Sequence, residues 1–360
     1  MHGWIERGSI TIGKSALGVS VAICCHNGEN RLAPVLAHLQ AQRVGEVPWE
    51  VLVVDNASTD RTSEVARECW PTHAPAPLRV ITERILGLNR ARVCALSEAR
   101  YELVSFIDDD NWVAADWVSA ASRAMSADPL LGAILSVNHP IADRPLPPWF
   151  QRYCGYYAAW AVDESAAPPP PHVLIGAGMT IRKAAFVDIA SKGFRPLATD
   201  RVGRDLSSSG DEELGYALML AGWKLRLERS LRLEHYLTPN RLEWGYCRRL
   251  VRAEEKSNVV LDSYFWPTQY APGMKNRLRQ TWWWHFAIES LALIRHHSVV
   301  KLVSSCVHEM EHDGEVIEIE KRIGRLIGLA RMRSQYRTAR RTVAQAPWRR
   351  RDSFLAAGDF

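Results

Sequence analysis

Glu102-Leu-Val-Ser-Phe-Ile-Asp-Asp-Asp-Asn111 is a short apolar run that leads directly into three consecutive carboxylates. A strand buried on both faces of a parallel sheet shows such a continuous apolar run, so a strand is predicted over residues 103–107. The carboxylates of Asp108, Asp109 and Asp110 then lie at the carboxyl end of that strand, where open α/β sheets bind their ligands. A divalent cation relieves their mutual repulsion, and hard oxygen ligands suit Mg²⁺ or Mn²⁺. The alternative is a solvated acidic turn in which Asn111 caps a helix.

Strand and helix patterns alternate four times along residues 19–107. Strands are predicted over 19–25, 50–54 and 78–82 as well as 103–107, with helices near 32–42, 61–69 and 87–100 between them. This alternation is typical of a parallel, doubly wound α/β sheet. Polar residues also follow the first two strands, at His26-Asn27 and at Asp55-Asn56. We therefore expect them to meet the three aspartates at one edge of the sheet.

The composition is that of an ordinary globular protein. Of 360 residues, 47% are hydrophobic and 24% are charged, and the net charge is +5. This length allows one large α/β domain and a smaller appendage. Seven cysteines without a CxxC spacing predict free thiols in a reducing cytosol rather than a disulfide framework or a zinc site. Cys24 and Cys25 are interpreted as a small apolar pair at a strand end, because neighbouring residues on a strand point to opposite faces.

No targeting or membrane-spanning segment is predicted. Residues 1–17 lack the apolar core of a signal peptide, and no uncharged apolar run reaches the roughly 18 residues that a spanning helix needs. Residues 166–171 form a Pro-rich connector that is neither helix nor central strand. We expect a cytoplasmic protein.

Three stretches carry a resemblance to a known family: Val19-Ser-Val-Ala-Ile-Cys-Cys-His-Asn-Gly-Glu29, Glu50-Val-Leu-Val-Val-Asp-Asn-Ala-Ser-Thr-Asp-Arg-Thr62 and Phe106-Ile-Asp-Asp-Asp110. In this order and spacing they resemble family 2 glycosyltransferases with the GT-A fold, over about residues 18–260. The resemblance implies a Rossmann-like α/β fold, with a mostly parallel sheet flanked by helices and a C-terminal helical extension. Cys25-His26 depart from the family, where many members have a small residue and an aromatic one.

The resemblance implies a nucleotide-diphosphate sugar as donor and a divalent metal, Mn²⁺ or Mg²⁺, as cofactor. The family's Asp-x-Asp motif falls on Asp108 and Asp110, and a carboxylate-bound metal offsets the charge that develops on the diphosphate. The predicted nucleotide-sugar-binding residues are Asn27, Glu29, Asp55, Asn56, Arg90, Asp108 and Asp109. The predicted metal ligands are Asp110 and His235, which ends a predicted strand over 231–235. A purely structural role for His235 is the alternative.

Ser207-Ser-Ser-Gly-Asp-Glu-Glu-Leu214 resembles the family's Gly-Glu-Asp-x-Glu-Leu motif. The motif's catalytic aspartate, the general base of inverting members, then falls on Asp211, while Gly210 replaces the common glutamate. Glu212 is the competing candidate, so both are predicted catalytic residues. The alternative is a helix start in which Ser209 or Asp211 is the N-cap and the acidic residues favour the helix dipole.

Residues 138–172 are rich in proline and aromatic residues. Aromatic rings suit the apolar faces of sugars, but they could equally pack a long loop onto the sheet. The aromatic residues are Trp149, Phe150, Tyr153, Tyr156, Tyr157 and Trp160. Gly176 and Gly178 follow, and they fit either a close backbone approach to the donor or a bulged strand.

The C-terminal part is predicted to be helical and basic. Trp282 to Ile294 is expected either to pack on the catalytic domain or to lie on a membrane surface, and Val316 to Ala330 forms an amphipathic helix. Residues 331–351 hold eight arginines and no acidic residue, which favours an anionic membrane surface over nucleic acid. The predicted division is an N-terminal extension 1–17, a glycosyltransferase domain 18–262 with halves 18–137 and 138–262, a helical extension 263–345 and a basic tail 346–360.

The implied activity is transfer of one sugar to a glycan, a lipid-linked acceptor or another hydroxyl acceptor, in inverting mode, for surface polysaccharide biosynthesis. The Gln-x-x-Arg-Trp motif of processive synthases is absent from the sequence, which favours single transfer. A sugar nucleotidyltransferase is one alternative, although His26 to Asn30 is not a Gly- and Arg/Lys-rich phosphate loop. A catalytically silent sugar-nucleotide-binding scaffold is the other, and Gly210 leaves room for it. Retaining transfer is the outcome if Asp211 is not the base.

Overall fold

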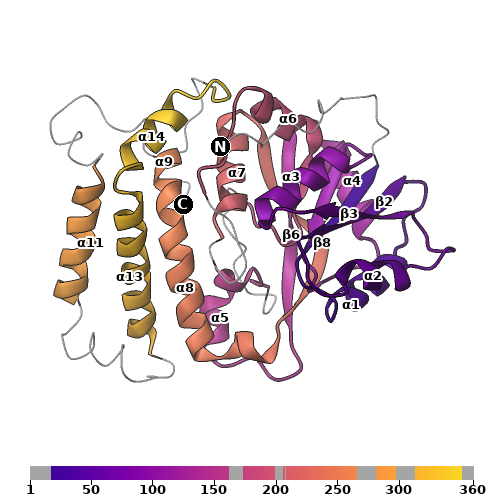
Figure 1. The fold of residues 1–360 in the computed structure, drawn as a ribbon, viewed down its shortest axis with the longest axis horizontal. Helices are drawn as coiled ribbons and strands as arrows, with labels where there is room; N and C mark the ends of the chain where they lie inside the picture. Colours follow the sequence, from indigo (N-terminus) through magenta and orange to yellow (C-terminus); the bar gives the residue numbers. More distant parts are fainter. Residues whose placement is uncertain are drawn as a thin grey trace.

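The structure, a computed structural model, describes residues 18–161, 173–198, 206, 208–265, 281–296 and 313–350. The predicted N-terminal extension 1–17, the Pro-rich connector and Cys306 lie outside these residues. In the described parts, the sheet and its helices occupy one side of the molecule, and the C-terminal helices stand in a row on the other (Figure 1).

An eight-stranded sheet forms the centre, in the order β3-β2-β1-β4-β7-β6-β8-β5. Its strands are β1 (Val19–Cys25), β2 (Trp49–Asn56), β3 (Leu78–Glu83), β4 (Leu103–Ile107), β5 (Asn111–Val113), β6 (Leu131–Ile141), β7 (Thr180–Arg182) and β8 (Lys224–Tyr236). The first four strands are all parallel, as predicted. The other half is mixed, because β7 runs antiparallel between β4 and β6, and β5 runs antiparallel to β8.

The helices connect and cover the strands. They are α1 (Leu32–Gln40), α2 (Thr62–Glu68), α3 (Leu88–Glu98), α4 (Trp117–Ala127), α5 (Phe150–Tyr153), α6 (Lys183–Ser191), α7 (Gly210–Leu220), α8 (Trp244–Asn258), α9 (Asp262–Phe265), α11 (Trp282–His296), α13 (Gly314–Met332) and α14 (Tyr336–Ala344), with 3₁₀ turns η1 (Cys154–Tyr157), η2 (Pro239–Leu242) and η3 (Val259–Leu261). Helix α2 begins one residue later than predicted, and Asp60 accepts the Thr62 amide hydrogen as a cap.

Alternate residues of each central strand enter two separate cores. On β1, Ala22 packs with α3, α6 and α7, whereas Val21 and Ile23 pack with α1 and α4. Almost all side chains of both clusters are buried. Because both faces of these strands are buried, each strand is an uninterrupted run of apolar residues in the sequence. The strand ends can therefore carry polar groups only at the sheet edge, where the chain leaves both cores.

The predicted strand over 231–235 is the end of the longer strand β8. Asn111 opens β5 and pairs with His235, so the sequence-based alternative of Asn111 as a helix cap is wrong. Its side chain instead accepts the Asp108 amide hydrogen, at 2.9 Å, and holds the acidic turn in shape. This pairing brings the third aspartate, Asp110, beside His235, although they are 125 positions apart.

The C-terminal helices pack on the rest of the protein. Helix α13 lies along α8, and α11 lies on the outer side of α13 (Figure 1). Gly324 and Gly328 allow this contact, because an added Cβ would come within 2.4 Å of backbone oxygens of α8. The carboxylate of Glu320 on α13, which is 1% exposed, pairs with Arg248 and Arg252. The helix predicted over Val316 to Ala330 is thus confirmed, but its contact with α8 is made by Glu320, Gly324 and Gly328, and Ala330 of the predicted apolar face is exposed.

Part of the predicted basic tail is also packed. Trp348 is buried against the helices on one face of the sheet, near Phe194 and Tyr264. Just before this tail, in α14, the buried Arg340 guanidinium lies over the ring of Tyr336, 5.3 Å from its centroid. No helix in the described parts of the chain is long and apolar enough to cross a membrane.

Candidate functional site

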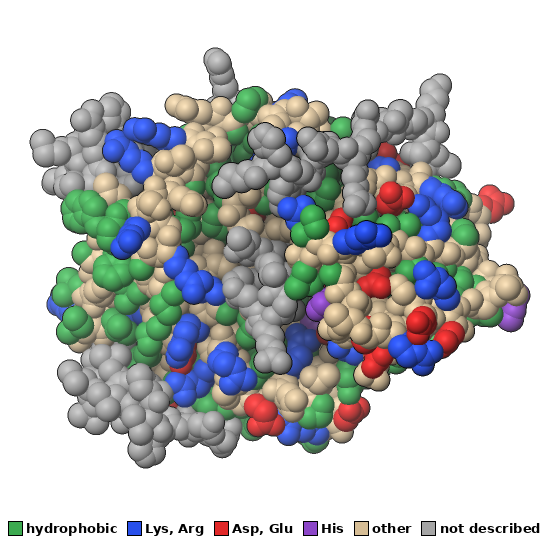
Figure 2. Space-filling model, viewed as in Figure 1, with side chains coloured by type: hydrophobic (Ala, Val, Ile, Leu, Met, Phe, Trp, Pro, Cys, Tyr) green, Lys and Arg blue, Asp and Glu red, His purple; other side chains and the backbone are tan. Residues whose placement is uncertain are grey.

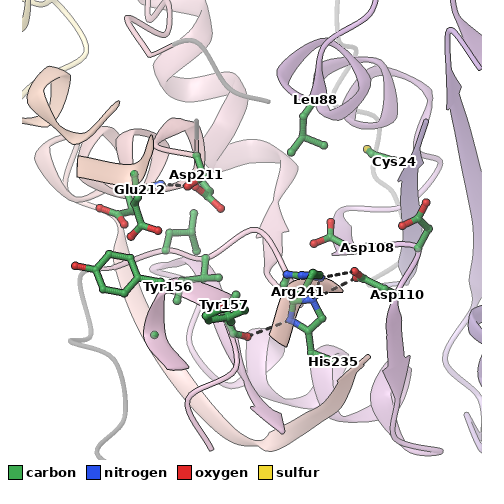
Figure 3. A pocket seen from close by; sticks show the side chains of 18 of the residues that line it. Cys24, Leu88, Asp108, Asp110, Tyr156, Tyr157, Asp211, Glu212, His235 and Arg241 are labelled. Carbon is green, nitrogen blue, oxygen red and sulfur yellow. Dashed lines mark hydrogen bonds and ion pairs between the residues drawn. The ribbon is translucent and has the colours of Figure 1, made fainter. Parts of the chain in front are cut away.

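A pocket with a volume of about 720 Å³ opens at the carboxyl edge of the parallel strands. The acidic turn after β4, the end of β8 and η2 form one side of it, and α7 and α8 form the other. Figure 3 shows Asp108, Asp110, His235 and Arg241 facing Asp211 and Glu212 across this space. The two motifs that the sequence singled out therefore line one cavity.

Asp110, His235 and Arg241 form a cluster on the strand-end side. One Asp110 carboxylate oxygen lies 3.4 Å from His235 Nε2, and the other accepts a hydrogen bond from Arg241 Nη1 at 2.9 Å. Arg241 Nη1 is also 3.2 Å from His235 Nε2. His235 Nδ1 lies 3.5 Å from the Ala158 carbonyl oxygen, and a proton on Nδ1 leaves the Nε2 lone pair toward the cluster.

Asp109 is turned toward the β1–α1 loop. It accepts two hydrogen bonds from Arg31, at 2.7 and 3.1 Å, and one from the Cys25 thiol at 3.0 Å. The hydrogen bond to Asp109 raises the pKa of Arg31, and burial followed by the charge of Asp109 raises the pKa of Cys25. Cys25 is therefore a buried, protonated thiol that donates a hydrogen bond to Asp109. This contact does not support a role for Cys25 as a metal ligand, because a metal binds the thiolate.

Two of the predicted nucleotide-binding residues connect two loops, and a third lies within one of them. Asn27 Oδ1 accepts the Thr59 amide hydrogen and Glu29 accepts that of Arg61, which joins the loop after β1 to the loop after β2. Asp55 accepts the Ser58 amide hydrogen within the second loop, at 3.1 Å. The pocket lining includes none of Asn27, Glu29 and Asp55.

Asn56 does line the pocket, where it shapes the wall beside α3. Its side-chain NH₂ donates to the carbonyls of Glu83 and Ile85, and its oxygen accepts the Gly87 amide hydrogen at 2.7 Å. These three bonds fix the turn that begins α3. Asn56 thus positions a loop, and its amide is already committed to backbone groups.

Asp211 sits at the first turn of α7 and is held by several donors. Its Oδ2 accepts the Gly176 amide hydrogen at 2.5 Å and lies 3.8 Å from Arg92 Nη2. Its Oδ1 accepts the Glu212 amide hydrogen. The helix start predicted as an alternative is therefore real, and Asp211 lines the pocket from it.

Glu212 points into the pocket beside other acids. Burial, and then the charges of Asp211 and Glu255, raise its pKa from 4.5 to about 8. Burial also raises the pKa of Glu255, whose carboxylate accepts a hydrogen bond from the Tyr156 hydroxyl at 3.2 Å. Glu212 is thus protonated at neutral pH. Glu213, by contrast, is fully buried and accepts hydrogen bonds from Leu197, Ala198 and Tyr264, which is a structural role.

Gly176 lies close to Arg92 and Asp211, whereas its predicted approach to the donor stays a prediction. A Cβ there would lie 1.9 Å from Arg92 Nη2 and 2.8 Å from Asp211 Oδ2. Gly178 has a φ of +84°, and its Cβ would lie 2.0 Å from Ser136 Oγ. The segment is not a long strand, because only Thr180–Arg182 joins the sheet.

The aromatic residues after β6 divide between packing and lining. Trp149 and Phe150 are buried in a cluster with α8, so the packing interpretation holds for them. Tyr156 lines the pocket next to Glu255. The packing interpretation is thus confirmed for Trp149 and Phe150, and contact of the aromatic rings with a sugar stays a prediction.

Three arginines that line the pocket, Arg31, Arg92 and Arg152, are not among the residues predicted from the sequence, and the predicted Arg90 lies on α3 outside the lining. Helical geometry separates Arg90 from Arg92 by about 200° around α3. Arg241 lines the pocket from the turn η2 before α8. Its position shortly after the predicted strand over 231–235 is the signal that the sequence offers for it.

The donor set at the acidic turn is suited to a divalent cation that a ligand also binds. Among the described residues, no three His, Cys, Asp or Glu side chains come together as a metal-binding group. Asp110 and His235 supply one oxygen and one nitrogen, and a guanidinium already bridges them as a stand-in cation. Mg²⁺ is commonly held by one or two carboxylates plus substrate phosphates, and carboxylate ligands also suit Mn²⁺, so the residues fit such a site.

Comparison with known proteins identifies the family that the site resembles. Residues 20–189 match the family model of Glycosyl transferase family 2. The putative glycosyltransferase EpsH of Bacillus subtilis (strain 168) is 27% identical over 105 residues, which are 29% of each chain. The glycosyltransferase GlyA of Streptococcus pneumoniae serotype 4 is 27% identical over 123 residues, 33% of this chain and 17% of that protein. The matched regions span less than a third of these relatives.

Solved structures show the same fold at low identity. The mannosyltransferase PcManGT from Pyrobaculum calidifontis, in complex with GDP-Man and Mn²⁺, has a TM-score of 0.53 and 19% identity, covering 92% of this chain and 91% of that one. GalNAc-T7 with UDP, GalNAc and Mn²⁺ has a TM-score of 0.51 and 16% identity, covering 81% and 54%. The predicted GT-A fold is confirmed.

Proposed function

Residues 20–189 carry a family 2 glycosyltransferase domain, and from this premise we propose that the chain transfers one sugar from a nucleotide-diphosphate sugar to a hydroxyl acceptor. The observation that supports it most is the placement of Asp110 and Asp211 on opposite sides of one pocket. A leaving diphosphate needs positive charge, and an attacking hydroxyl needs a base on the other face of the sugar. Transfer with this geometry inverts the anomeric centre.

The donor diphosphate would bind at the acidic turn. Asp110 and His235 would hold Mn²⁺ or Mg²⁺, with Asp108 at the same edge and Arg31 and Arg241 as further positive charge. When bound, the metal stabilises negative charge on the diphosphate. The loops joined by Asn27 and Glu29 would shape the space for the nucleotide, together with Asp55, Asn56 and Asp109. PcManGT and GalNAc-T7 were solved with Mn²⁺, which supports the metal.

Asp211 is the general base of this proposal. Arg92 and the Gly176 amide hold its carboxylate in place, so it can take the acceptor proton as the acceptor oxygen attacks the anomeric carbon. The bond from that carbon to the diphosphate breaks in the same step. Glu212, protonated below about pH 8, would donate a hydrogen bond to the acceptor instead of removing its proton.

The acceptor would be a glycan or a lipid-linked sugar in surface polysaccharide synthesis. The pocket beyond Asp211 carries Tyr156, Glu254 and Glu255, which suit the ring face and hydroxyls of a sugar. The predicted boundary at residue 262 would then separate the catalytic domain from the helices that support its acceptor side, whereas Trp348 of the predicted basic tail packs with the catalytic domain. The six cysteines of the described residues form no disulfide with one another, and we place the protein in a reducing cytoplasm.

Helix α11 would rest on an anionic membrane surface. Trp283, Ile288, Leu291 and Ile294 on its outward side are 45–69% exposed, and Figure 2 shows hydrophobic side chains gathered at that edge. Near its first turn, where His285 meets Tyr336, the exposed Arg333 and Arg337 provide positive charge. Exposed apolar residues beside arginines are the composition of an interfacial helix.

Thermal stabilisation with UDP-, GDP-, dTDP- and CDP-sugars, each with and without Mn²⁺, tests the proposed donor site. Binding to the folded state raises the melting temperature by mass action. We expect a metal-dependent rise with one nucleotide, lost in Asp110→Ala and kept in the remote control Asp128→Asn. If no donor raises the melting temperature, the proposal that the chain binds a nucleotide sugar is wrong. If a donor raises the melting temperature but no sugar is transferred to any acceptor, the catalytically silent scaffold is favoured.

Cosedimentation with vesicles tests the membrane surface separately. We expect the full chain to bind vesicles with anionic lipid more than neutral ones, and Leu291→Glu with Ile294→Glu to abolish binding. Leu130→Glu is the control, because Leu130 is 55% exposed outside α11. Binding that survives the α11 changes would contradict this assignment, and a change of oligomeric state in them would point to a second copy of the chain.

A further inference from the structure

The guanidinium of Arg241 lies between the two predicted metal ligands. Its Nη1 is 2.9 Å from an Asp110 oxygen and 3.2 Å from His235 Nε2. Both bonds use lone pairs that a metal ion would need for coordination. The proposed ligands are therefore already engaged by a cation that belongs to the chain itself.

Arg241 is incompletely satisfied in this position. Its side chain is 15% exposed, and its buried Nε has no hydrogen-bond partner within the described structure. A buried donor without a partner costs about 1–3 kcal/mol, so the arrangement is not the best one available to this side chain. Arg241 also lines the pocket, so its guanidinium can turn away from Asp110 and His235 toward a ligand bound in the pocket.

The backbone that carries Arg241 is held in place. Pro239 begins the turn η2, and its carbonyl accepts a hydrogen bond from Arg144 at 2.8 Å. Arg144 also pairs with Glu243 at the start of α8. A change in the position of the guanidinium therefore needs only rotations of the Arg241 side chain, with no movement of the turn.

We propose that Arg241 and a divalent metal ion alternate at the Asp110–His235 pair. Without metal, the guanidinium holds the two ligands. When the metal binds, Arg241 is displaced by repulsion between like charges and by loss of both acceptors. The released guanidinium then turns into the pocket and binds the diphosphate of the donor. This inference depends on the metal-binding part of the proposed function.

The exchange predicts that metal binds weakly to the free protein and tightly together with the donor. Displacing Arg241 takes away two hydrogen bonds, one of them to a charged group, and a diphosphate restores them. Metal and donor would thus favour each other's binding by the same factor, as linkage requires. Arg241 acts here as a positioning residue and as an electrostatic competitor.

Mn²⁺ binding to the full chain, measured by the electron paramagnetic resonance of free Mn²⁺, tests the exchange without sugar transfer. We expect Arg241→Gln to bind Mn²⁺ at least about tenfold more tightly than the wild type in the absence of donor. Arg241→Lys should lie between them, because it keeps the charge but lacks the planar fork. The matched control is Arg152→Gln, which removes another arginine of the pocket lining and should leave the affinity unchanged.

Each outcome separates the exchange from the proposed function. A merely structural loss in Arg241→Gln could weaken Mn²⁺ binding but not tighten it. Equal or weaker binding than the wild type would overturn the exchange and leave the metal site standing, provided that Asp110→Asn abolishes binding. If neither protein binds Mn²⁺ with any of the four nucleotides present, the metal part of the proposed function is overturned together with the exchange.

Discussion

On the strand-end side of the pocket, Asp109 and Asp110 each contact an arginine, whereas on the helix side Asp211, Glu212 and Glu255 lie close together beside Arg92. On the first side each of these carboxylates has an arginine as its partner. On the second side burial and the neighbouring acids raise the pKa of Glu212 to about 8, which leaves it neutral at pH 7. An arginine partner can be exchanged for another cation, and a protonated Glu212 beside Asp211 can divide the roles of proton donor and proton acceptor between two acids.

Removing the base on the helix side should have the largest effect. Asp211→Asn keeps the shape of the side chain but cannot accept the acceptor proton, so we expect kcat to fall by about 10²–10⁴. Donor binding, measured by thermal shift, should stay unchanged because the strand-end side is intact. Asp128→Asn, which removes a carboxylate far from the pocket, should keep full activity. Loss of donor binding in Asp211→Asn would mean that the two sides are not independent.

Gly176→Ala should disturb the position of that base without removing it. The new Cβ would lie 1.9 Å from Arg92 Nη2, so either the arginine or the Asp211 carboxylate must move. We expect kcat to fall by about 10–100-fold, since a displacement of the order of an ångström in a catalytic group has effects of this size. Gly155→Ala is the control, because its Cβ would meet nothing within 4 Å. Unchanged steady-state rates in Gly176→Ala would argue against Arg92 as a positioning residue.

The raised pKa of Glu212 predicts how the helix side responds to pH. The folded protein binds this proton up to about pH 8, whereas an unfolded glutamate releases it near 4.5, so ionisation costs stability as the pH rises through this window. Glu212→Gln should therefore be more stable than the wild type at about pH 9, on the order of a few kcal/mol, with little difference at about pH 4. Urea unfolding at both pH values measures this.

The pH–rate profile gives a second view of the same group. The wild-type rate should fall above about pH 8, when Glu212 ionises beside Asp211, and Glu212→Gln should lack this decline. A decline that persists in the variant would assign that titration to another group.

The paired charges on the strand-end side predict the smallest effect. Arg31→Gln removes both hydrogen bonds to Asp109, but the Arg31 side chain is 37% exposed, and solvent weakens such pairs. We expect a loss of about 1 kcal/mol in the free energy of unfolding, measured with urea. Arg61→Gln, whose partners Glu64 and Glu68 are about as exposed as Arg61 itself, should change it by less. A loss of several kcal/mol in Arg31→Gln would show that Asp109 depends on this charge more than its exposure indicates.

The parallel half of the sheet and the two acidic motifs could be predicted from the amino-acid order. An uninterrupted apolar run such as Val51 to Val54 is stable only when both of its faces are buried, so it predicts a central strand. The carboxylates of Asp108 to Asp110 cannot be buried in the core in the same way, so they must lie where the strand ends. The sequence also marked Gly176 as a position where the backbone comes close to another group, and in the structure a Cβ there would lie 1.9 Å from Arg92 Nη2.

Which side chains complete the site depends on the tertiary structure, because contacts between distant parts of the chain bring them together. Pairing of Asn111 with His235 places Asp110 beside the end of β8, and the turn η2 then directs Arg241 onto both. Arg92 rather than Arg90 meets Asp211 because of its angular position on α3. These contacts join residues far apart in the chain, and pairing register and helix rotation are set by the packing of the whole domain rather than by local pattern. For the same reason Trp348 is part of the core and not of a free tail.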